Sequence, residues 1–111
     1  MPADRRYDVR WAAAASRDLE DLIAFVARGS PGNAGRLLAR LHTAASSLER
    51  YPSRGRIVPE LMHFGIRQWR ELVIRPYRLV YRVERRSVSV LAVFDGRRDL
   101  EDVLLERLLR S

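Results

Sequence analysis

Arginine is the residue type with which this sequence could do chemistry, and four arginines stand out by position. Arg70, Arg78, Arg97 and Arg98 lie within, or directly after, a stretch of β-type sequence. A guanidinium group is planar, stays charged at physiological pH and binds phosphate or carboxylate through two parallel hydrogen bonds. We therefore predict that these arginines, together with Glu71, form the surface that contacts a target or a partner protein.

Arg78 has two interpretations that the residues alone leave open. Between Tyr77 and Glu84, apolar residues alternate with mostly charged ones, which predicts a strand with one apolar face and one cationic face. On an exposed face, Arg78 would bind a carboxylate or a phosphate of the target. It would equally well pair with Glu71 on a neighbouring strand. Likewise, Arg70 or Glu71 could simply hold the strand edge.

Other reactive groups are sparse. The chain contains no cysteine, which removes disulfides and thiolate nucleophiles from consideration. The two histidines, His42 and His63, lie far apart in sequence, and no nearby carboxylates suggest a metal cage. We expect no metal site and no cofactor.

Charge favours a macromolecular partner. The formal net charge is +7, and all 21 basic residues are arginine. Such a chain suits nucleic acid or an acidic protein, although coding bias toward alanine and arginine would also produce it. No apolar run approaches the roughly 20 residues that span a bilayer, so we expect no membrane segment and a cytoplasmic location. A length of 111 residues predicts a single domain covering 1–111.

The N-terminal half predicts one strand and two helices. Tyr7–Trp11 alternates apolar and polar residues, as a short strand does. Helical spacing then follows up to Gly29, a residue typical of a helix end. Ser30 is a suitable N-cap and Pro31 a suitable first helical residue for a second helix that reaches about Glu49. The two helices should form an antiparallel hairpin.

The C-terminal half predicts three strands and a helix. Ser53 to His63 contains proline and glycine and should be a connection. Three β-type runs follow, at about Arg67 to Ile74, Tyr77 to Glu84 and Val88 to Phe94, and the last is apolar enough to be a central strand covered on both faces. A short amphipathic helix is expected from Leu100 to Leu109. The fold class is therefore α+β, with an N-terminal strand and a helical hairpin packed on a mostly antiparallel, four-stranded sheet.

In this order of motifs the chain resembles the RelE/ParE superfamily of bacterial type II toxins. The resemblance covers nearly the whole chain and is carried by Trp11, Ala15, Asp18, Leu19, Ile23, Ser30, Pro31, Ala34, Leu48 to Pro52, Val58, Pro59, Arg70 to Leu72, Tyr77 to Val83 and Gly96 to Asp99. It implies a toxin held inactive by an antitoxin. RelE-like members cut messenger RNA in the ribosome, whereas ParE-like members inhibit DNA gyrase.

The ribonuclease branch implies acid and base groups that are missing at the matched positions. Arg78 and Arg98 match its phosphate-binding arginines. Its basic pair, however, falls on Glu71 and Val73, and its C-terminal proton donor falls on Leu104. Metal-independent cleavage needs a base for the 2′-hydroxyl and an acid for the leaving oxygen.

The preferred interpretation is therefore a ParE-like gyrase inhibitor without catalytic residues, of the kind linked to plasmid stabilisation. In the alternative, a ribosome-dependent endoribonuclease, Arg78 and Arg98 would bind phosphate and Glu71 or Glu60 would act as base. A protein of this fold without toxicity is a third possibility. The resemblance and the positive charge together predict an acidic, ParD-like antitoxin that folds on binding.

Overall fold

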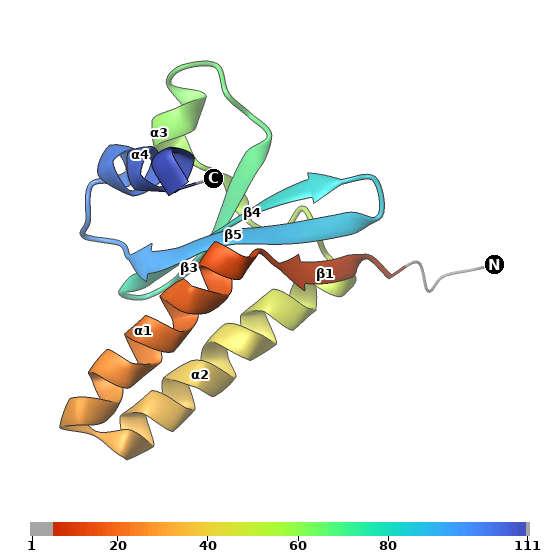
Figure 1. The fold of residues 1–111 in the computed structure, drawn as a ribbon. Helices are drawn as coiled ribbons and strands as arrows, with labels where there is room; N and C mark the ends of the chain where they lie inside the picture. The colour runs from red at the N-terminus through yellow and green to blue at the C-terminus, as the bar shows by residue number, and fades with distance from the viewer. Residues whose placement is uncertain (1–5, 111) are drawn as a thin grey trace.

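The computed structural model describes residues 6–110, which form a mixed sheet, a helical hairpin and two shorter helices (Figure 1). The elements follow one another as β1 (Asp8–Trp11), α1 (Ala13–Gly29), α2 (Pro31–Ser46), the 3-10 helix η1 (Ser47–Glu49), β2 (Arg56–Ile57), α3 (Pro59–Met62), β3 (Trp69–Ile74), β4 (Tyr77–Glu84), β5 (Ser87–Asp95) and α4 (Leu100–Arg110). The α+β class and the order of the predicted elements are confirmed.

The sheet has five strands in the order β1-β5-β4-β3-β2, so the prediction of four strands was wrong. The additional strand, β2, pairs only Arg56 with Glu71 and Ile57 with Arg70. Two residues are too few to show a period-two pattern, which is why the sequence between Ser53 and His63 indicated only a connection. All neighbours pair antiparallel except β1 and β5, as the mostly antiparallel prediction requires.

The helical hairpin turns at a single residue. Ser30 adopts an extended backbone conformation, and its hydroxyl accepts a hydrogen bond from the Asn33 N–H at 3.2 Å, so the predicted N-cap is confirmed. Pro31 occupies the first helical position. The α-helix ends at Ser46, and the chain continues to Glu49 as a 3-10 turn, close to the predicted end.

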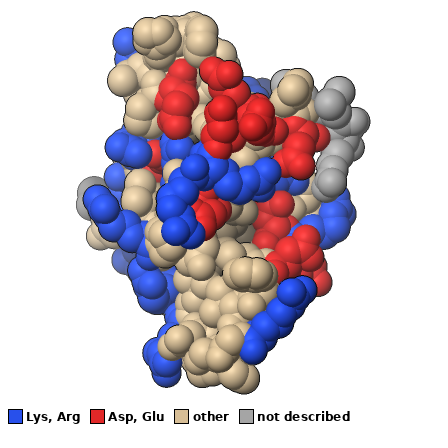
Figure 2. Space-filling view, turned by 90° about the vertical axis from the view of Figure 1, so that its left-hand side faces the viewer, with Lys and Arg blue, Asp and Glu red and all other residues tan. Residues whose placement is uncertain are grey.

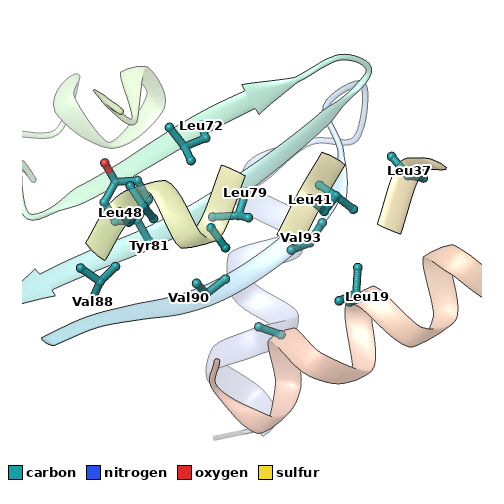
Figure 3. Close-up of a cluster of buried hydrophobic side chains, with 12 residues drawn as sticks. Leu19, Leu37, Leu41, Leu48, Leu72, Leu79, Tyr81, Val88, Val90 and Val93 are labelled. Carbon is teal, nitrogen blue, oxygen red and sulfur yellow. The ribbon is translucent and has the colours of Figure 1, made fainter. Parts of the chain in front are cut away.

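The main core lies between this hairpin and one face of the sheet. Leu41 of α2, Leu79 and Tyr81 of β4 and Val90 of β5 are fully buried in it. Figure 3 shows these side chains converging from the helices and the strands. Apolar residues at helical spacing and at every second strand position supply this core, as the sequence pattern predicts.

The opposite face of the sheet is covered as well, by α3 and α4. Val80, Ala92 and Phe94 from the strands form a second buried cluster with Leu100 and Val103 of α4. The prediction of an open cationic face is therefore wrong at this end of the sheet. The predicted burial of the last strand on both faces is confirmed for Ala92 to Phe94, whereas Ser89 and Leu91 are half-buried. No helix within residues 6–110 is both long and apolar enough to cross a lipid bilayer.

Candidate functional site

Arg78 lies at the centre of a network of two carboxylates and two guanidinium groups. Its Nε donates to Oε1 of Glu71 at 2.7 Å, and its two terminal nitrogens donate to the two carboxylate oxygens of Glu60, each at 2.8 Å. The other oxygen of Glu71 accepts from Nε of Arg56 at 2.7 Å. Of the two interpretations of Arg78, the structure contains the ion pair with Glu71 on the neighbouring strand.

Four elements position this network. Arg56 lies on β2, Glu60 on α3, Glu71 on β3 and Arg78 on β4. Glu71 is paired in register with Val80, two residues along β4 from Arg78, so the two side chains lie on the same face of the sheet. The Arg78 guanidinium also lies 5.5 Å from the centroid of the Phe94 ring on β5.

The charged groups at the centre of the network are buried. Glu71 is 1% exposed and Arg78 is 7% exposed. Because two carboxylates face two guanidinium groups, the network is neutral. Buried charges persist when they are paired and hydrogen bonded in this way.

Pairing also alters the acid–base properties of these groups. Hydrogen bonds from Arg78 hold the pKa of Glu60 below its usual value, while the hydrogen bond to Glu60 raises the pKa of Arg78 above its own. A carboxylate with a lowered pKa is a weak proton acceptor at neutral pH. Glu60 and Glu71, the two candidate bases, are thus both bound to the arginine that would bind the phosphate.

Arg97 and Arg98 lie apart from this centre, on the loop between β5 and α4. Arg97 donates from Nε to Asp95 at 2.9 Å, and its side chain is 82% exposed. Its hydrogen bonds lower the pKa of Asp95 to about 2. Arg98 pairs with Glu106 of α4 at 3.0 Å. Exposed ion pairs are weak, so both arginines remain available to a partner.

Arg70 has a structural contact of a different kind. Its guanidinium donates to the carbonyl oxygen of Gly55 at 2.7 Å and, more weakly, to that of Ser53 at 3.3 Å. Arg70 therefore ties β3 to the loop before β2. The five predicted contact residues thus fall in three places: the buried network, the β5–α4 loop and the loop before β2.

Tyr81 secures that same loop from inside the core. Its hydroxyl donates to the Pro52 carbonyl oxygen at 2.7 Å and accepts the Gly55 N–H at 2.9 Å. Burial raises the pKa of this phenol. A Cβ atom on Gly55 would lie only 2.6 Å from the Glu71 carbonyl oxygen, so the close approach requires glycine.

Sequence reasoning missed two contributions to the site. Arg56 was not assigned to it, although Arg54-Gly55-Arg56 places two cations in the connection. The helix α3, which presents Glu60 to Arg78, was also missed. Its signal is Pro59 at the first helical position, but a four-residue helix is too short to show a periodic pattern.

Two further features of the described residues are the placement of possible metal ligands and the distribution of surface charge. Within residues 6–110 no three His, Asp or Glu side chains lie close enough together to hold a metal ion. On the face that carries α4 and the tip of the hairpin, acidic and basic side chains lie side by side in the upper half (Figure 2). The lower half has an uncharged centre with basic side chains on both flanks.

Comparison with known proteins gives a consistent family. Residues 9–100 match the model of the ParE toxin of the type II toxin-antitoxin system parDE. The chain is 34% identical over 101 residues to the putative toxin Y4kP of Sinorhizobium fredii, covering 89% of this chain and 98% of that protein. It is 35% identical over 86 residues to toxin RelE2 of Caulobacter vibrioides, covering 77% and 90%.

Solved structures agree on the fold. A chain of the chromosomal ParDE system from P. aeruginosa superposes with a TM-score of 0.66 at 17% identity, covering 82% of this chain and 97% of that chain. A chain of the toxin-antitoxin complex RelBE2 from Mycobacterium tuberculosis gives a TM-score of 0.59 at 28% identity, covering 81% and 91%.

Proposed function

Since this chain belongs to the ParE family of type II toxin–antitoxin toxins, we propose that it acts by binding DNA gyrase and inhibiting it. A gyrase target implies that the chain acts in the cytoplasm. It also implies that the chain works as a binding protein, without a catalytic residue of its own.

The observation that supports this proposal is that both candidate bases are hydrogen bonded to arginine. Glu60 and Glu71 are hydrogen bonded to Arg78, and Glu71 is also bound to Arg56. Glu71 is buried, and both its oxygens are bound to arginines, so it is not free to accept a proton from a ribose hydroxyl. Glu60 is partly exposed, but Arg78 lowers its pKa and makes it a weak proton acceptor. A neutral network with a buried centre is instead suited to fixing α3 and the strands in one arrangement that a partner can recognise.

An antitoxin is the second proposed partner. The solved relatives include a ParDE system and a RelBE2 complex that contains both toxin and antitoxin. A +7 chain favours an acidic, ParD-like antitoxin, because opposite charge speeds association and stabilises the encounter complex. Binding of that antitoxin would cover the surface that the target needs.

The predicted contact residues take different roles in this proposal. Arg97 and Arg98 would contact the target directly, because their guanidinium groups are held only by exposed ion pairs. Arg70, Glu71 and Arg78 would act as positioning residues that hold the loop before β2, α3 and the strands in place.

The test is a gyrase supercoiling assay with purified chain and the double variant Arg97→Ala/Arg98→Ala. We expect wild-type chain to inhibit supercoiling, and the double variant to need about tenfold more protein, equivalent to about 1.4 kcal/mol of binding free energy. Arg17→Ala is a control because it removes an exposed arginine from α1. Full supercoiling at excess wild-type chain would reject the gyrase target.

A ribosome-dependent messenger RNA endoribonuclease is the second candidate. It is favoured by one observation: Arg78, Arg56 and the partly exposed carboxylate of Glu60 lie within one cluster. If the proposed gyrase activity is correct, programmed ribosomes should keep their messenger intact when the chain is added. Cleavage that disappears in the Glu60→Gln variant would instead support the nuclease.

A further inference from the structure

A hollow of about 720 Å³ lies beside the segment that joins η1 to β2. Its size suits a small molecule, since ligand pockets in proteins commonly measure about 300–1,000 Å³. The buried network and the β5–α4 loop contribute nothing to it. The residues that line it come from one short segment: Ser47, Arg50, Tyr51, Pro52, Ser53 and Arg54.

Tyr51 is the aromatic wall of this hollow, and it is 65% exposed. An exposed ring beside a hollow offers a flat surface on which a second planar group can stack. Its neighbour Pro52 adds further apolar surface to the wall. The hollow is therefore suited to the planar, aromatic part of a ligand.

The main chain of this segment is fixed from inside the protein. The Tyr81 hydroxyl, which belongs to a fully buried side chain, donates to the Pro52 carbonyl oxygen at 2.7 Å. Arg70 donates to the carbonyl oxygen of Ser53 at 3.3 Å. A wall that is already held in position loses little conformational entropy when a ligand binds. The exposed ring of Tyr51 thus stands on a preorganised support.

Arg54 joins this hollow to a second one. The second hollow, of about 710 Å³, lies between α2 and the end of β3, and Arg40, Arg54 and Arg75 line it. Arg54 donates to the Ser47 hydroxyl at 2.6 Å, and no carboxylate within residues 6–110 pairs with it. Among these described residues, no acidic side chain lines either hollow. The space next to Tyr51 therefore continues into a strongly cationic region.

The chemistry of the two hollows defines a class of ligand. We propose that together they bind a nucleoside triphosphate, with its base on Tyr51 and its phosphates along Arg54 toward Arg40 and Arg75. Guanidinium groups bind phosphate oxygens through charge-assisted hydrogen bonds, and three of them supply the positive charge that a triphosphate needs. This site is separate from the Arg97–Arg98 contact proposed for gyrase.

A single-stranded nucleic acid would need a different surface. Proteins that bind single strands stack successive bases on several aromatic side chains along a cationic groove. Within residues 6–110, Tyr51 is the one aromatic residue that lines either hollow. A ligand with one base and several phosphates therefore matches this arrangement better than a strand does.

The probes are ATP, GTP, AMP and inorganic triphosphate, titrated into the purified chain by isothermal titration calorimetry. ATP should bind about tenfold more tightly than AMP, which lacks the outer phosphates, and than triphosphate, which lacks the base. Stacking accepts any base, so GTP should bind about as tightly as ATP. Equal affinities for ATP and triphosphate would overturn the proposal, because the base would then contribute nothing.

Two sets of variants separate the base from the phosphates. Tyr51→Ala should weaken ATP binding about tenfold, whereas Tyr51→Phe, the matched control, keeps the ring and most of the affinity. Arg40→Ala/Arg75→Ala should lower the affinity for ATP to that for AMP and leave AMP binding unchanged. All three positions are exposed, so the variants should fold as wild type does, which circular dichroism checks. Equal ATP affinity of Tyr51→Ala and Tyr51→Phe would contradict the stacked base.

A short single-stranded DNA provides the final comparison, and it should bind more weakly than ATP. If it bound more tightly and lost that affinity in Tyr51→Ala, the hollows would be a single-strand site and our proposal would be wrong. None of these measurements involves gyrase, so their failure is distinct from a failure of the proposed function.

Discussion

At the scale of single residues, the burial of Arg78 decides what this side chain can do. Its guanidinium is satisfied by Glu71 and Glu60 and lies over the ring of Phe94. Releasing it to bind an external phosphate would leave the carboxylate of Glu71, which is 1% exposed, with only Arg56 as a partner. Leaving a buried charge unpaired costs several kcal/mol, so Arg78 supports the structure more readily than it binds a ligand.

This role predicts a large effect of a small change at Glu71. Glu71→Gln removes the negative charge but keeps the size of the side chain, and leaves the buried guanidinium of Arg78 with Glu60 alone. We expect the free energy of unfolding to fall by about 3 kcal/mol, measured by urea denaturation.

A double variant provides the control for this prediction. In Glu71→Leu/Arg78→Met both buried charges are gone, and Glu60 is exposed enough to be solvated by water. The double variant should be more stable than Glu71→Gln, because removing a buried pair altogether costs less than breaking it. A double variant less stable than the single one would contradict this account.

At the scale of elements, the loop before β2 determines where β2 and its arginine lie. The Tyr81 hydroxyl and the Arg70 guanidinium hold the main chain of Pro52, Ser53 and Gly55 from opposite directions. β2 is only two residues long and pairs with a single strand. The position of β2 therefore depends more on the loop than on its own backbone pairing with β3.

Glycine substitutions at two positions should change stability in opposite directions. In Gly55→Ala the new Cβ would lie 2.6 Å from both the Glu71 carbonyl oxygen and the Tyr81 hydroxyl oxygen, so we expect a loss of about 2 kcal/mol. In Gly35→Ala, on α2, the new Cβ would meet no atom within 4 Å beyond its own stretch of helix, and the better helix propensity of alanine should add about 1 kcal/mol.

Thermal unfolding followed by circular dichroism measures both changes. The Gly35→Ala variant is the matched control, since it makes the same chemical change in open space. A Gly55→Ala variant as stable as wild type would mean that the loop can move away from β3, against the close packing described above.

At the scale of the whole molecule, Asp18 joins three elements that are distant in sequence. β1 ends at Trp11, opposite Val90, and β5 continues beyond it. The Asp18 carboxylate of α1 accepts the N–H of Val93 at 3.1 Å in that extension, and it also pairs with Arg107 of α4. One side chain therefore connects the helical hairpin, the sheet and the C-terminal helix across the molecule.

Removing this carboxylate should loosen α4 without unfolding the hairpin. In Asp18→Ala the helix keeps Leu100 and Val103 in the second core but loses its ion pair with α1. We expect amide exchange in α4 to quicken by roughly tenfold, equivalent to about 1.4 kcal/mol, while exchange in α2 stays the same. Asp21→Ala removes an exposed carboxylate from the same helix and is the control. Equal exchange in the two variants would refute the connection.

The sequence by itself determined the elements that are long enough to repeat a pattern. Local spacing predicts the helix up to Gly29 and the three β-type runs, because their patterns repeat over several turns or residue pairs. The start of the second helix is predicted by its cap residues, Ser30 and Pro31. The resemblance in the order of motifs also predicted the family that the comparisons show. These features depend on neighbours along the chain, which a sequence displays directly.

Only the tertiary structure decided which charges are free. In the sequence, Arg78 and Arg97 are both arginines near a strand, but α3 brings Glu60 onto the first, and the second stays in solvent. β2 and α3 were equally hidden, because two strand residues and four helical residues are too few to repeat a pattern. Ion pairs in this network join residues up to 18 positions apart. This pairing sets the burial of the side chains, their pKa and their availability to a partner.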